Sequence, residues 1–243
     1  MKITPFKKAW RRGIIIETDT GVGEVSPLPG FSEETYEEAL FQLNHLEDFD
    51  SYYPSVEFGL ASAAIPFPKP DPIPYAHFYN DTDVEHPCIK LKLGDLSLEE
   101  GIAKAKHVRT LCEHLRVDFN QKWSLKDALA FSNSFPTGTF DFIEEPTKDL
   151  FAFLSSSPHP VAVDEHLRTL SLDALLALPI KAAVIKPTLV GNNLPLDALK
   201  DRGIIPILSS SFESDIGLTH ICHLHHHHKL TAPIGIDTAK FLK

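Results

Sequence analysis

Five acidic or basic residues each lie at the end of a short apolar run, and together they could form one reactive site. In chain order they are Lys92, Asp118, Glu144, Asp164 and Lys186. Consecutive members are 20 to 26 residues apart, which fits one strand-plus-helix unit of roughly 20 to 30 residues in a parallel α/β barrel. The spacing therefore predicts that all five lie at the ends of successive parallel strands.

The three carboxylates should converge, because residues at the carboxyl ends of barrel strands face one shared mouth. Asp118, Glu144 and Asp164 cannot all remain ionised at contact distance without a cation, because like charges repel and burial adds a desolvation penalty. A hard divalent cation resolves this conflict, and a set of oxygen ligands favours magnesium or manganese over zinc. The sequence therefore predicts a Mg²⁺ site, with Mn²⁺ as the alternative ion.

Two lysines flank the carboxylates in strand order, on strands expected at opposite sides of the mouth. Lys92 and Lys186 are therefore candidate acid/base residues for proton abstraction next to a carboxylate, where the metal and the second lysine would neutralise the enediolate. Lys90 shares a strand face with Lys92, so its charge should favour the neutral amine of Lys92. By strand alternation, Glu145 and Glu165 should lie outside the ligand set.

The elements that must position these residues begin after a proline-rich stretch. Residues 65–74 carry proline at every second position from Pro66 to Pro74, a pattern that excludes a helix and a central strand. We place a domain boundary there, with a small α+β domain at residues 1–72 and a barrel domain at residues 73–243. In the first domain we expect a hairpin over 13–26 and a helix over 32–48 capped by Ser32.

Eight apolar strand candidates follow the boundary, with helical patterns such as 98–114 and 170–178 between them. The strands are expected at residues 74–78, 88–93, 115–119, 140–143, 161–163, 182–185, 204–208 and 234–236. Alternating strands and helices indicate a parallel sheet, and eight strands indicate a TIM-like barrel. Only about eight residues separate the first two strands, too few for a crossover helix, so this barrel should lack its first helix.

The composition is that of an ordinary globular protein. The 243 residues are 43% hydrophobic and carry a formal net charge of −10, and no basic cluster exceeds the one from Lys7 to Arg12. A nucleic-acid partner is therefore not expected. Three widely spaced cysteines argue against disulfides and thiolate zinc sites and suit a reducing cytoplasm. We expect neither a signal peptide nor a membrane helix, and the sequence does not indicate an oligomeric state.

The residues resemble the enolase superfamily, in its muconate-lactonizing-like subgroup, and within it the o-succinylbenzoate synthase family. The likeness runs from near the start of the chain to Thr238. It is carried by Gly23-Glu24-Val25-Ser26-Pro27-Leu28-Pro29-Gly30-Phe31-Ser32, Lys90-Leu91-Lys92, Arg116-Val117-Asp118-Phe119-Asn120, Ile143-Glu144-Glu145-Pro146, Asp164-Glu165, Ile185-Lys186-Pro187-Thr188 and Ser209-Ser210-Ser211-Phe212-Glu213-Ser214.

This resemblance implies a (β/α)7β barrel under a capping domain and a role for each matching residue. In this family three carboxylates bind magnesium and two lysines act as acid and base. Enolase-superfamily sites are known to combine a lysine or histidine base with magnesium in this way. The loop with Pro29, Gly30 and Phe31 would close over the substrate, the run with Ser209 and Ser211 would lie along its succinyl or carboxylate end, and Arg116 and Asn120 would lie near substrate and metal.

The implied reaction is dehydration of 2-succinyl-6-hydroxy-2,4-cyclohexadiene-1-carboxylate to 2-succinylbenzoate in menaquinone biosynthesis, through a magnesium-stabilised enediolate. The chain departs from the family pattern in its shortness, its end soon after Thr238, His166 in place of a common serine, and a bulky Phe119, which should face away from the mouth. Two alternatives stay open. One is N-succinylamino acid racemase or dipeptide epimerase chemistry, and the other is a metal-sequestering protein built on the histidines at 223–228.

Overall fold

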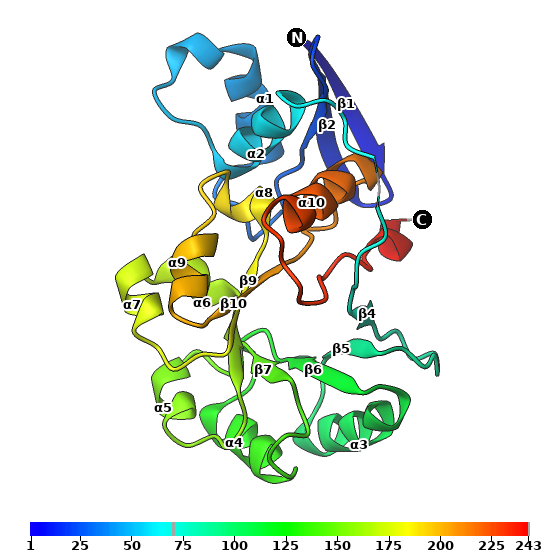
Figure 1. The fold of residues 1–243 in the computed structure, drawn as a ribbon, viewed down its shortest axis with the longest axis vertical. Coiled ribbons are helices and arrows are strands. Elements are labelled where there is room, and N and C mark those ends of the chain that lie inside the picture. The colour runs from blue at the N-terminus through cyan, green and yellow to red at the C-terminus, as the bar shows by residue number, and fades with distance from the viewer. Residues whose placement is uncertain (70, 243) are drawn as a thin grey trace. The chain divides into compact units, whose positions relative to one another are not determined.

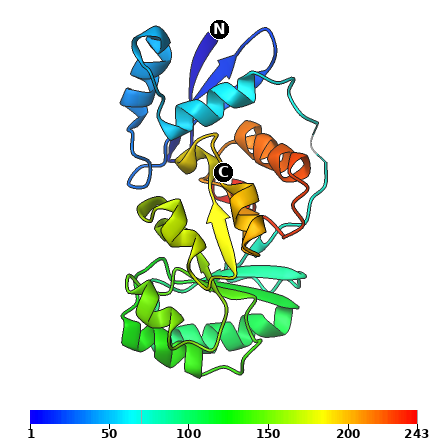
Figure 2. The same ribbon diagram turned by 60° about the vertical axis from the view of Figure 1, so that its left-hand side comes forward.

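A computed structural model describes residues 1–69 and 71–242 of the chain (Figures 1 and 2). Pro70, one of the prolines of the expected connector, lies outside the described residues. The chain forms two compact units. The first unit comprises Met1–Pro74, Ile185–Leu194 and Leu208–Lys243, and the second comprises Tyr75–Val184 and Pro195–Ile207.

The first unit contains a three-stranded antiparallel sheet in the order β1-β2-β3. Its strands are β1 (Lys2–Lys8), β2 (Arg11–Glu17) and β3 (Val22–Val25). The predicted hairpin corresponds to β2 and β3, whose turn closes with a hydrogen bond of 2.9 Å from Thr18 N to Gly21 O. The edge strand β1 was not predicted; Pro5 is compatible with it because an edge strand needs fewer ladder donors.

Two helices and one 3₁₀ turn follow this sheet: α1 (Tyr36–Asn44), η1 (Leu46–Asp48) and α2 (Pro54–Ala63). The single helix predicted over 32–48 is therefore divided, and its expected cap is wrong. Thr35 caps α1 in a capping box with Glu38. The hydroxyl of Ser32 instead accepts a hydrogen bond from Leu28 N at 2.8 Å, so Ser32 shapes the preceding loop.

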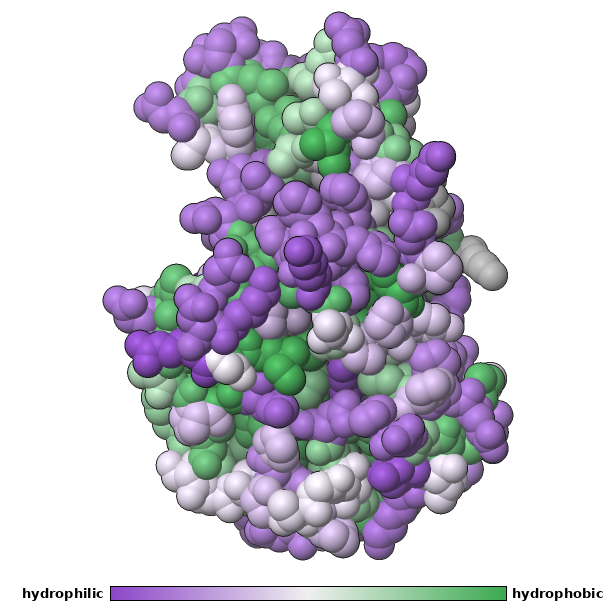
Figure 3. Space-filling view, in the orientation of Figure 1, coloured by the Kyte–Doolittle hydropathy of each residue, from purple (hydrophilic) through white to green (hydrophobic). Residues whose placement is uncertain are grey.

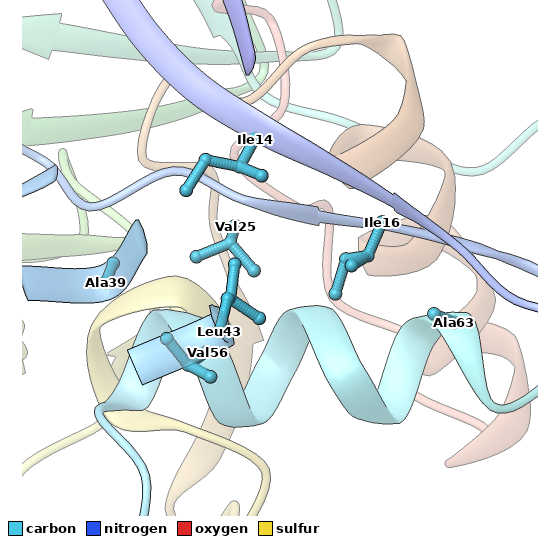
Figure 4. Close-up of a cluster of buried hydrophobic side chains, with 7 residues drawn as sticks. All are labelled: Ile14, Ile16, Val25, Ala39, Leu43, Val56 and Ala63. Atoms are coloured by element: carbon cyan, nitrogen blue, oxygen red, sulfur yellow. The ribbon is translucent and has the colours of Figure 1, made fainter. Parts of the chain in front are cut away.

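The core of the first unit lies between its sheet and its helices (Figure 4). It consists of buried apolar side chains from both, namely Ile14, Ile16, Val25, Ala39, Leu43, Val56 and Ala63. Helix α2 approaches β3 so closely that a Cβ on Gly59 would lie 2.3 Å from Val25 Cγ2. Glycine at position 59 is thus required for this packing.

The second unit is built on a parallel sheet of seven strands in the order β10-β9-β8-β7-β6-β5-β4, curled as a half-barrel (Figure 1). Its strands are β4 (His77–Phe78), β5 (Cys88–Lys92), β6 (His114–Asp118), β7 (Phe142–Glu144), β8 (Val161–Val163), β9 (Ala182–Ile185) and β10 (Ile205–Leu208). The predicted parallel α/β sheet is confirmed. The expected eighth strand at 234–236 is reduced to an isolated parallel bridge between Ser209 and Gly235.

Helices connect most of these strands. They are α3 (Leu98–Val108), η2 (Arg109–Leu111), α4 (Leu125–Asn133), α5 (Leu150–Leu154), α6 (Glu165–Thr169), α7 (Leu172–Leu176), α8 (Pro187–Val190) and α9 (Leu196–Asp201). After the last strand come α10 (Asp215–His227) and η3 (Ala239–Leu242). No helix lies between β4 and β5, where all residues are described, as predicted. The helix predicted over 98–114 ends at Val108 and is followed by η2, and His114, its expected last residue, begins β6.

The outer surface mixes polar and apolar residues. The face seen in Figure 3 is mainly hydrophilic, with smaller hydrophobic patches between the polar regions. Scattered apolar side chains on a protein surface are normal. Within the described parts of the chain, none of the helices has the length and apolar character needed to cross a bilayer.

The Thr35 cap provides a test of the first unit. We expect Thr35→Ala to lower the free energy of unfolding by about 1 kcal/mol, because the amide of Glu38 loses its acceptor. Thr35→Ser should restore most of the loss, and Glu33→Ala, which removes an exposed side chain before the helix, should change it by less than about 0.5 kcal/mol. Urea unfolding followed by circular dichroism measures all three, and equal losses for Thr35→Ala and Glu33→Ala would contradict this cap.

Candidate active site

Charged side chains meet at the carboxyl ends of four adjacent strands, β5 to β8, in the second unit. The parallel register pairs Lys92 at the end of β5 with Asp118 on β6, and Asp118 with Glu144 on β7. Asp164 directly follows β8, the next strand in the sheet. Asp118, Glu144 and Asp164 are only 1%, 1% and 3% exposed. The sheet therefore collects three buried carboxylates at one edge, as their spacing in the sequence predicts.

The ammonium group of Lys90 binds two of these carboxylates directly. Lys90 Nζ lies 3.0 Å from Asp118 Oδ2 and 2.6 and 2.7 Å from the two carboxylate oxygens of Glu144. Burial acts to lower the pKa of Lys90, but the charges of Asp118, Glu144 and Asp164 outweigh burial and raise this pKa above its ordinary value. The charge of Lys90 therefore compensates that of the carboxylates.

This pairing differs from the role expected for Lys90 from the sequence. Strand alternation predicts that its charge acts mainly on Lys92, whereas the structure engages it with Asp118 and Glu144. Lys92 has a more exposed side chain, at 43%, and its Nζ lies 3.0 Å from Asn120 Oδ1 and 3.8 Å from Asp118 Oδ2. The two lysines of one strand thus differ: Lys90 is embedded among carboxylates, and Lys92 presents its amine at their rim.

Asn120 links several parts of this cluster. Its backbone N–H donates to Asp118 Oδ1 at 3.0 Å, and its side-chain amide donates to Glu165 Oε1 at 3.3 Å. The backbone of Asn120 has a φ of 47°, a left-handed conformation that asparagine tolerates better than most residues. Asn120 therefore orients both Asp118 and Lys92.

Glu145, the residue after Glu144, is hydrogen-bonded to residues that follow β6 and β8. Its buried carboxylate accepts hydrogen bonds from the backbone N–H groups of Asp164, at 2.6 Å, and His166, at 2.9 Å. It also contacts His166 Nδ1 at 2.6 Å and accepts from the Gln121 amide at 2.8 Å. This hydrogen bond with Glu145 raises the pKa of His166. That Glu145 lies outside the ligand set stays a prediction.

Gln121 and His166 were not among the predicted site residues. Their contact with Glu145 depends on how β6, β7 and β8 lie side by side, and no local sequence pattern indicates it. Phe119, in contrast, behaves as strand alternation predicts. Its side chain is fully buried against Trp123 and Phe131, with ring centroids 4.4 and 5.1 Å away.

The donor set of the cluster suits a hard divalent cation. Among residues 1–69 and 71–242, no three His, Cys, Asp or Glu side chains stand in an arrangement that could hold a metal ion as they are placed, and Lys90 supplies the positive charge. The cluster nevertheless offers buried carboxylates on adjacent strand ends, all of which act electrostatically on one cationic position. Oxygen donors of this kind are those that magnesium prefers.

The other predicted site residues belong to the first unit. They lie in the turn after β9, in the segment that follows β10, and in the loop of residues 27–31. Lys186 is the N-cap of α8. Ser209 donates from its backbone to Ile185 O at 2.8 Å, and Ser211 is fully buried. Pro29, Gly30 and Phe31 form an exposed loop tip in which Gly30 has a φ of 79°. The structure therefore groups these residues with the first unit, and the carboxylates with the second.

Arg116 belongs to the second unit and lies on β6, two residues before Asp118. Its Nε is 3.7 Å from Asp141 Oδ2, and its guanidinium packs over the ring of Phe142 at 5.0 Å from the centroid. The side chain is buried. Both contacts direct Arg116 toward the start of β7, and its expected proximity to substrate stays a prediction.

The histidines of α10 divide into structural and surface groups. His220 and His225 are buried, with Nε2 2.7 Å from Val22 O and 3.2 Å from Ala232 O, and burial lowers the pKa of each. His223 and His227 stack at 5.9 Å between centroids beside a pocket of about 390 Å³. The metal-sequestering alternative built on these histidines stays a prediction.

Chemically, the second unit joins a concentration of negative charge with an accessible amine. The carboxylates can hold a cation, and a cation there would attract a substrate carboxylate. Lys92 is close enough to Asp118 to act on a carbon atom next to such a carboxylate. The arrangement therefore suits proton abstraction α to a carboxylate.

Comparison with known proteins agrees with this chemistry. Residues 6–66 match the family described as MenC, N-terminal domain, and residues 80–183 match the family described as Enolase C-terminal domain-like. The o-succinylbenzoate synthase of Vibrio cholerae serotype O1 (strain M66-2) is 31% identical, in a match that covers 96% of this chain and 83% of that relative.

Solved structures show the same fold. The o-succinylbenzoate synthase from Thermosynechococcus elongatus BP-1, described as complexed with Mg in the active site, has a TM-score of 0.72 at 23% identity and covers 96% of this chain and 88% of that one. The dipeptide epimerase from Enterococcus faecalis V583 has a TM-score of 0.76 at 17% identity, with coverages of 100% and 90%. With the near full-length match to the Vibrio relative, these findings place the chain in the o-succinylbenzoate synthase family of the enolase superfamily.

Proposed function

We propose that this chain is an o-succinylbenzoate synthase, which dehydrates 2-succinyl-6-hydroxy-2,4-cyclohexadiene-1-carboxylate to 2-succinylbenzoate in menaquinone biosynthesis. The observation that carries this proposal is the match to a relative of that name over 96% of the chain. The cluster of Lys92 with Asp118 and Glu144 supports it, because the reaction begins with proton abstraction next to a carboxylate. The substrate is thus a small carboxylate.

Lys92 is the proposed base. Its amine removes the proton from the carbon that bears the substrate carboxylate, and the electrons of the broken C–H bond form the enediolate. When the C–O bond to the hydroxyl breaks, the resulting ammonium group of Lys92 returns the proton, and one water molecule leaves. Asn120 holds the amine of Lys92 through its side-chain oxygen, which limits the positions from which this proton moves.

Asp118, Glu144 and Asp164 would hold a magnesium ion, with manganese as a substitute. When bound, the ion supplies positive charge to the substrate carboxylate as negative charge develops there. Glu145 fixes the backbone of Asp164 for this role. Lys90 stays protonated between Asp118 and Glu144, so it moderates the repulsion among the ligands and takes no part in proton transfer.

Lys186 is proposed to remain cationic and to stabilise the enediolate from the side opposite Lys92. Its place supports this role: Lys186 directly follows β9, which is the neighbour of β8 in the sheet. We further propose that residues 1–72 form a capping domain and residues 73–243 a barrel domain. The loop with Pro29, Gly30 and Phe31 would then close over the substrate, and Ser209 and Ser211 would lie along its succinyl or carboxylate end.

Racemase or epimerase chemistry is the second candidate. It is favoured by one observation, the structural likeness to the Enterococcus faecalis dipeptide epimerase. That likeness concerns the fold alone, whereas the Vibrio relative is similar over the sequence. Assays with the cyclohexadiene substrate, with N-succinylamino acids and with dipeptides separate the candidates. Racemisation without dehydration would contradict our proposal.

The roles of the two lysines predict the effects of their removal. Lys92→Ala and Lys186→Ala should each lower kcat by about 10²-fold to 10⁴-fold, because one removes the base and the other the compensating charge. Lys106→Ala, a change on the exposed surface of α3, should leave kcat unchanged. The absorbance of the aromatic product measures the rate, and near-normal turnover in either variant would overturn the corresponding role.

The role of Lys90 predicts a link between stability and magnesium. Lys90→Met should destabilise the metal-free protein by about 3 to 5 kcal/mol, because Asp118 and Glu144 are left without their buried cation. Millimolar MgCl₂ should recover a large part of this loss, as a bound ion replaces the ammonium. Lys92→Met, which removes a more exposed amine, is the control and should cost about 1 kcal/mol or less.

Thermal and urea unfolding with and without MgCl₂ measure these differences. An equal loss in the two variants would show that Lys90 does not carry the compensation. A Lys90→Met protein that gains no stability from magnesium would argue against a metal site at these carboxylates.

A further inference from the structure

Three charged side chains are buried together in the first unit, apart from the carboxylates of the second. Arg11, Glu24 and Glu213 are 1%, 2% and 0% exposed. Arginine and glutamate are rarely buried to this extent unless they are paired and fully hydrogen-bonded. The chemistry proposed above uses none of the three, so their burial needs another explanation.

Arg11 connects two loops. From strand β2, its guanidinium donates to the backbone carbonyls of Ser26 and Pro27, where the loop of residues 27–31 begins. It also donates to the carbonyls of Ser211, at 3.0 Å, and Phe212, at 3.2 Å. One rigid planar group therefore fixes the spacing of two backbone segments that are far apart in the sequence.

Glu24 fixes the start of α10. Its carboxylate accepts hydrogen bonds from the N–H groups of Ser214, at 3.0 Å, and Gly217, at 3.0 Å, and from the hydroxyl of Ser26 at 2.8 Å. A negative charge at a helix N-terminus is favourable, because it meets unpaired N–H groups and the positive end of the helix dipole. A Cβ on Gly217 would lie 2.5 Å from Glu213 Cβ, so the helix start packs tightly on this network.

Glu213 extends the network to the turn that carries Lys186. Its carboxylate accepts from Thr188 Oγ1 at 2.5 Å and from Ser211 N at 2.7 Å. Thr188 is buried in α8, two residues after Lys186. Burial raises the pKa of Glu213, although the hydrogen bond from Thr188 opposes this shift. Glu213 thus ties the segment 209–214 to the helix that Lys186 caps.

We propose that Arg11, Glu24 and Glu213 form a buried latch that sets the positions of loop 27–31, segment 209–214 and the turn after Lys186. They are positioning residues, since the hydrogen bonds described above join them to other parts of the chain. The proposal rests on the proposed function in one respect: it takes these segments to be those that meet the substrate. Arg11 forms one arm of this latch, and Glu213 with its partner Thr188 forms the other. The two arms should then affect different kinetic constants.

The Arg11 arm should govern ligand binding, because Arg11 holds both loops. Arg11→Met should weaken the binding of 2-succinylbenzoate, measured by calorimetry in MgCl₂ on the full chain, by about tenfold or more and raise KM by a similar factor. Arg12→Met is the matched control. Arg12 is the next residue on the same strand, but it is exposed and pairs with Glu37 at the surface, so binding should stay within about twofold of wild type.

Arg11→Lys keeps the charge but loses the fork of donors, and it serves if Arg11→Met does not fold. Unfolding curves establish that each variant is native at the assay temperature. Binding and KM within about twofold of wild type in a folded Arg11 variant would overturn the latch. The same loss in Arg12→Met would also overturn it, because a general effect of removing charge from β2 would then explain the result.

The arm with Thr188 should govern turnover, because the hydrogen bond between Thr188 and Glu213 holds the helix that Lys186 caps. Thr188→Val removes the hydroxyl at nearly constant volume, and we expect kcat to fall by about tenfold while product binding changes by less than about twofold. Thr188→Ser restores the hydroxyl and should recover kcat to within about threefold. An unchanged kcat in Thr188→Val, or a serine variant no better than valine, would contradict this arm.

The wild-type protein separates a failure of the latch from a failure of the proposed function. If wild type neither turns over the cyclohexadiene substrate nor binds 2-succinylbenzoate, the proposed function is wrong, and with it the substrate-facing role assigned to these loops. If wild type does both and the Arg11 and Thr188 variants behave as wild type, only the latch is overturned.

Discussion

The ion pair of Lys90 with Asp118 and Glu144 is the constraint on which the candidate site depends. Parallel register places the two carboxylates side by side on β6 and β7, with almost no exposure to water. Buried charges of one sign are stable only next to a charge of the opposite sign. The fold therefore places the ammonium group of Lys90 between carboxylates before any ligand binds, and the same carboxylates can accept a metal ion. Lys90 is the less exposed of the two lysines on β5, with a side chain 14% exposed against 43% for Lys92.

Polar groups behind the reactive side chains hold them in place in both units. In the second unit, Glu145 binds the backbone of Asp164 and His166 and so joins the ends of β7 and β8. In the first unit, Arg11 and Glu213 join loops and helix starts. Glu145 and Arg11 each bind several backbone groups at once, and Glu213 binds one backbone N–H and one hydroxyl. Such networks position reactive groups well, because each buried donor that loses its partner carries a large penalty.

The sequence predicts those features that depend on local pattern. The strands at Val161–Val163 and Ala182–Ile185 agree in both bounds with prediction, because short apolar runs between turns leave little choice. The overextended helix at 98–114 shows the limit: His114 suits a helix end as well as a strand start. The pairing of Lys90 depends on register between strands, and the buried position of Arg11 depends on contacts with residues far along the chain. Neither could be found without tertiary contacts.

The most direct test of the account is a crystal structure of the full chain with magnesium and 2-succinylbenzoate. We expect one ion bound by oxygens of Asp118, Glu144 and Asp164 at about 2.0 to 2.1 Å. The ammonium groups of Lys92 and Lys186 should face opposite sides of the product ring. An ion bound elsewhere, or a product held away from the carboxylates, would contradict the central claim that these strand ends form a magnesium-dependent active site.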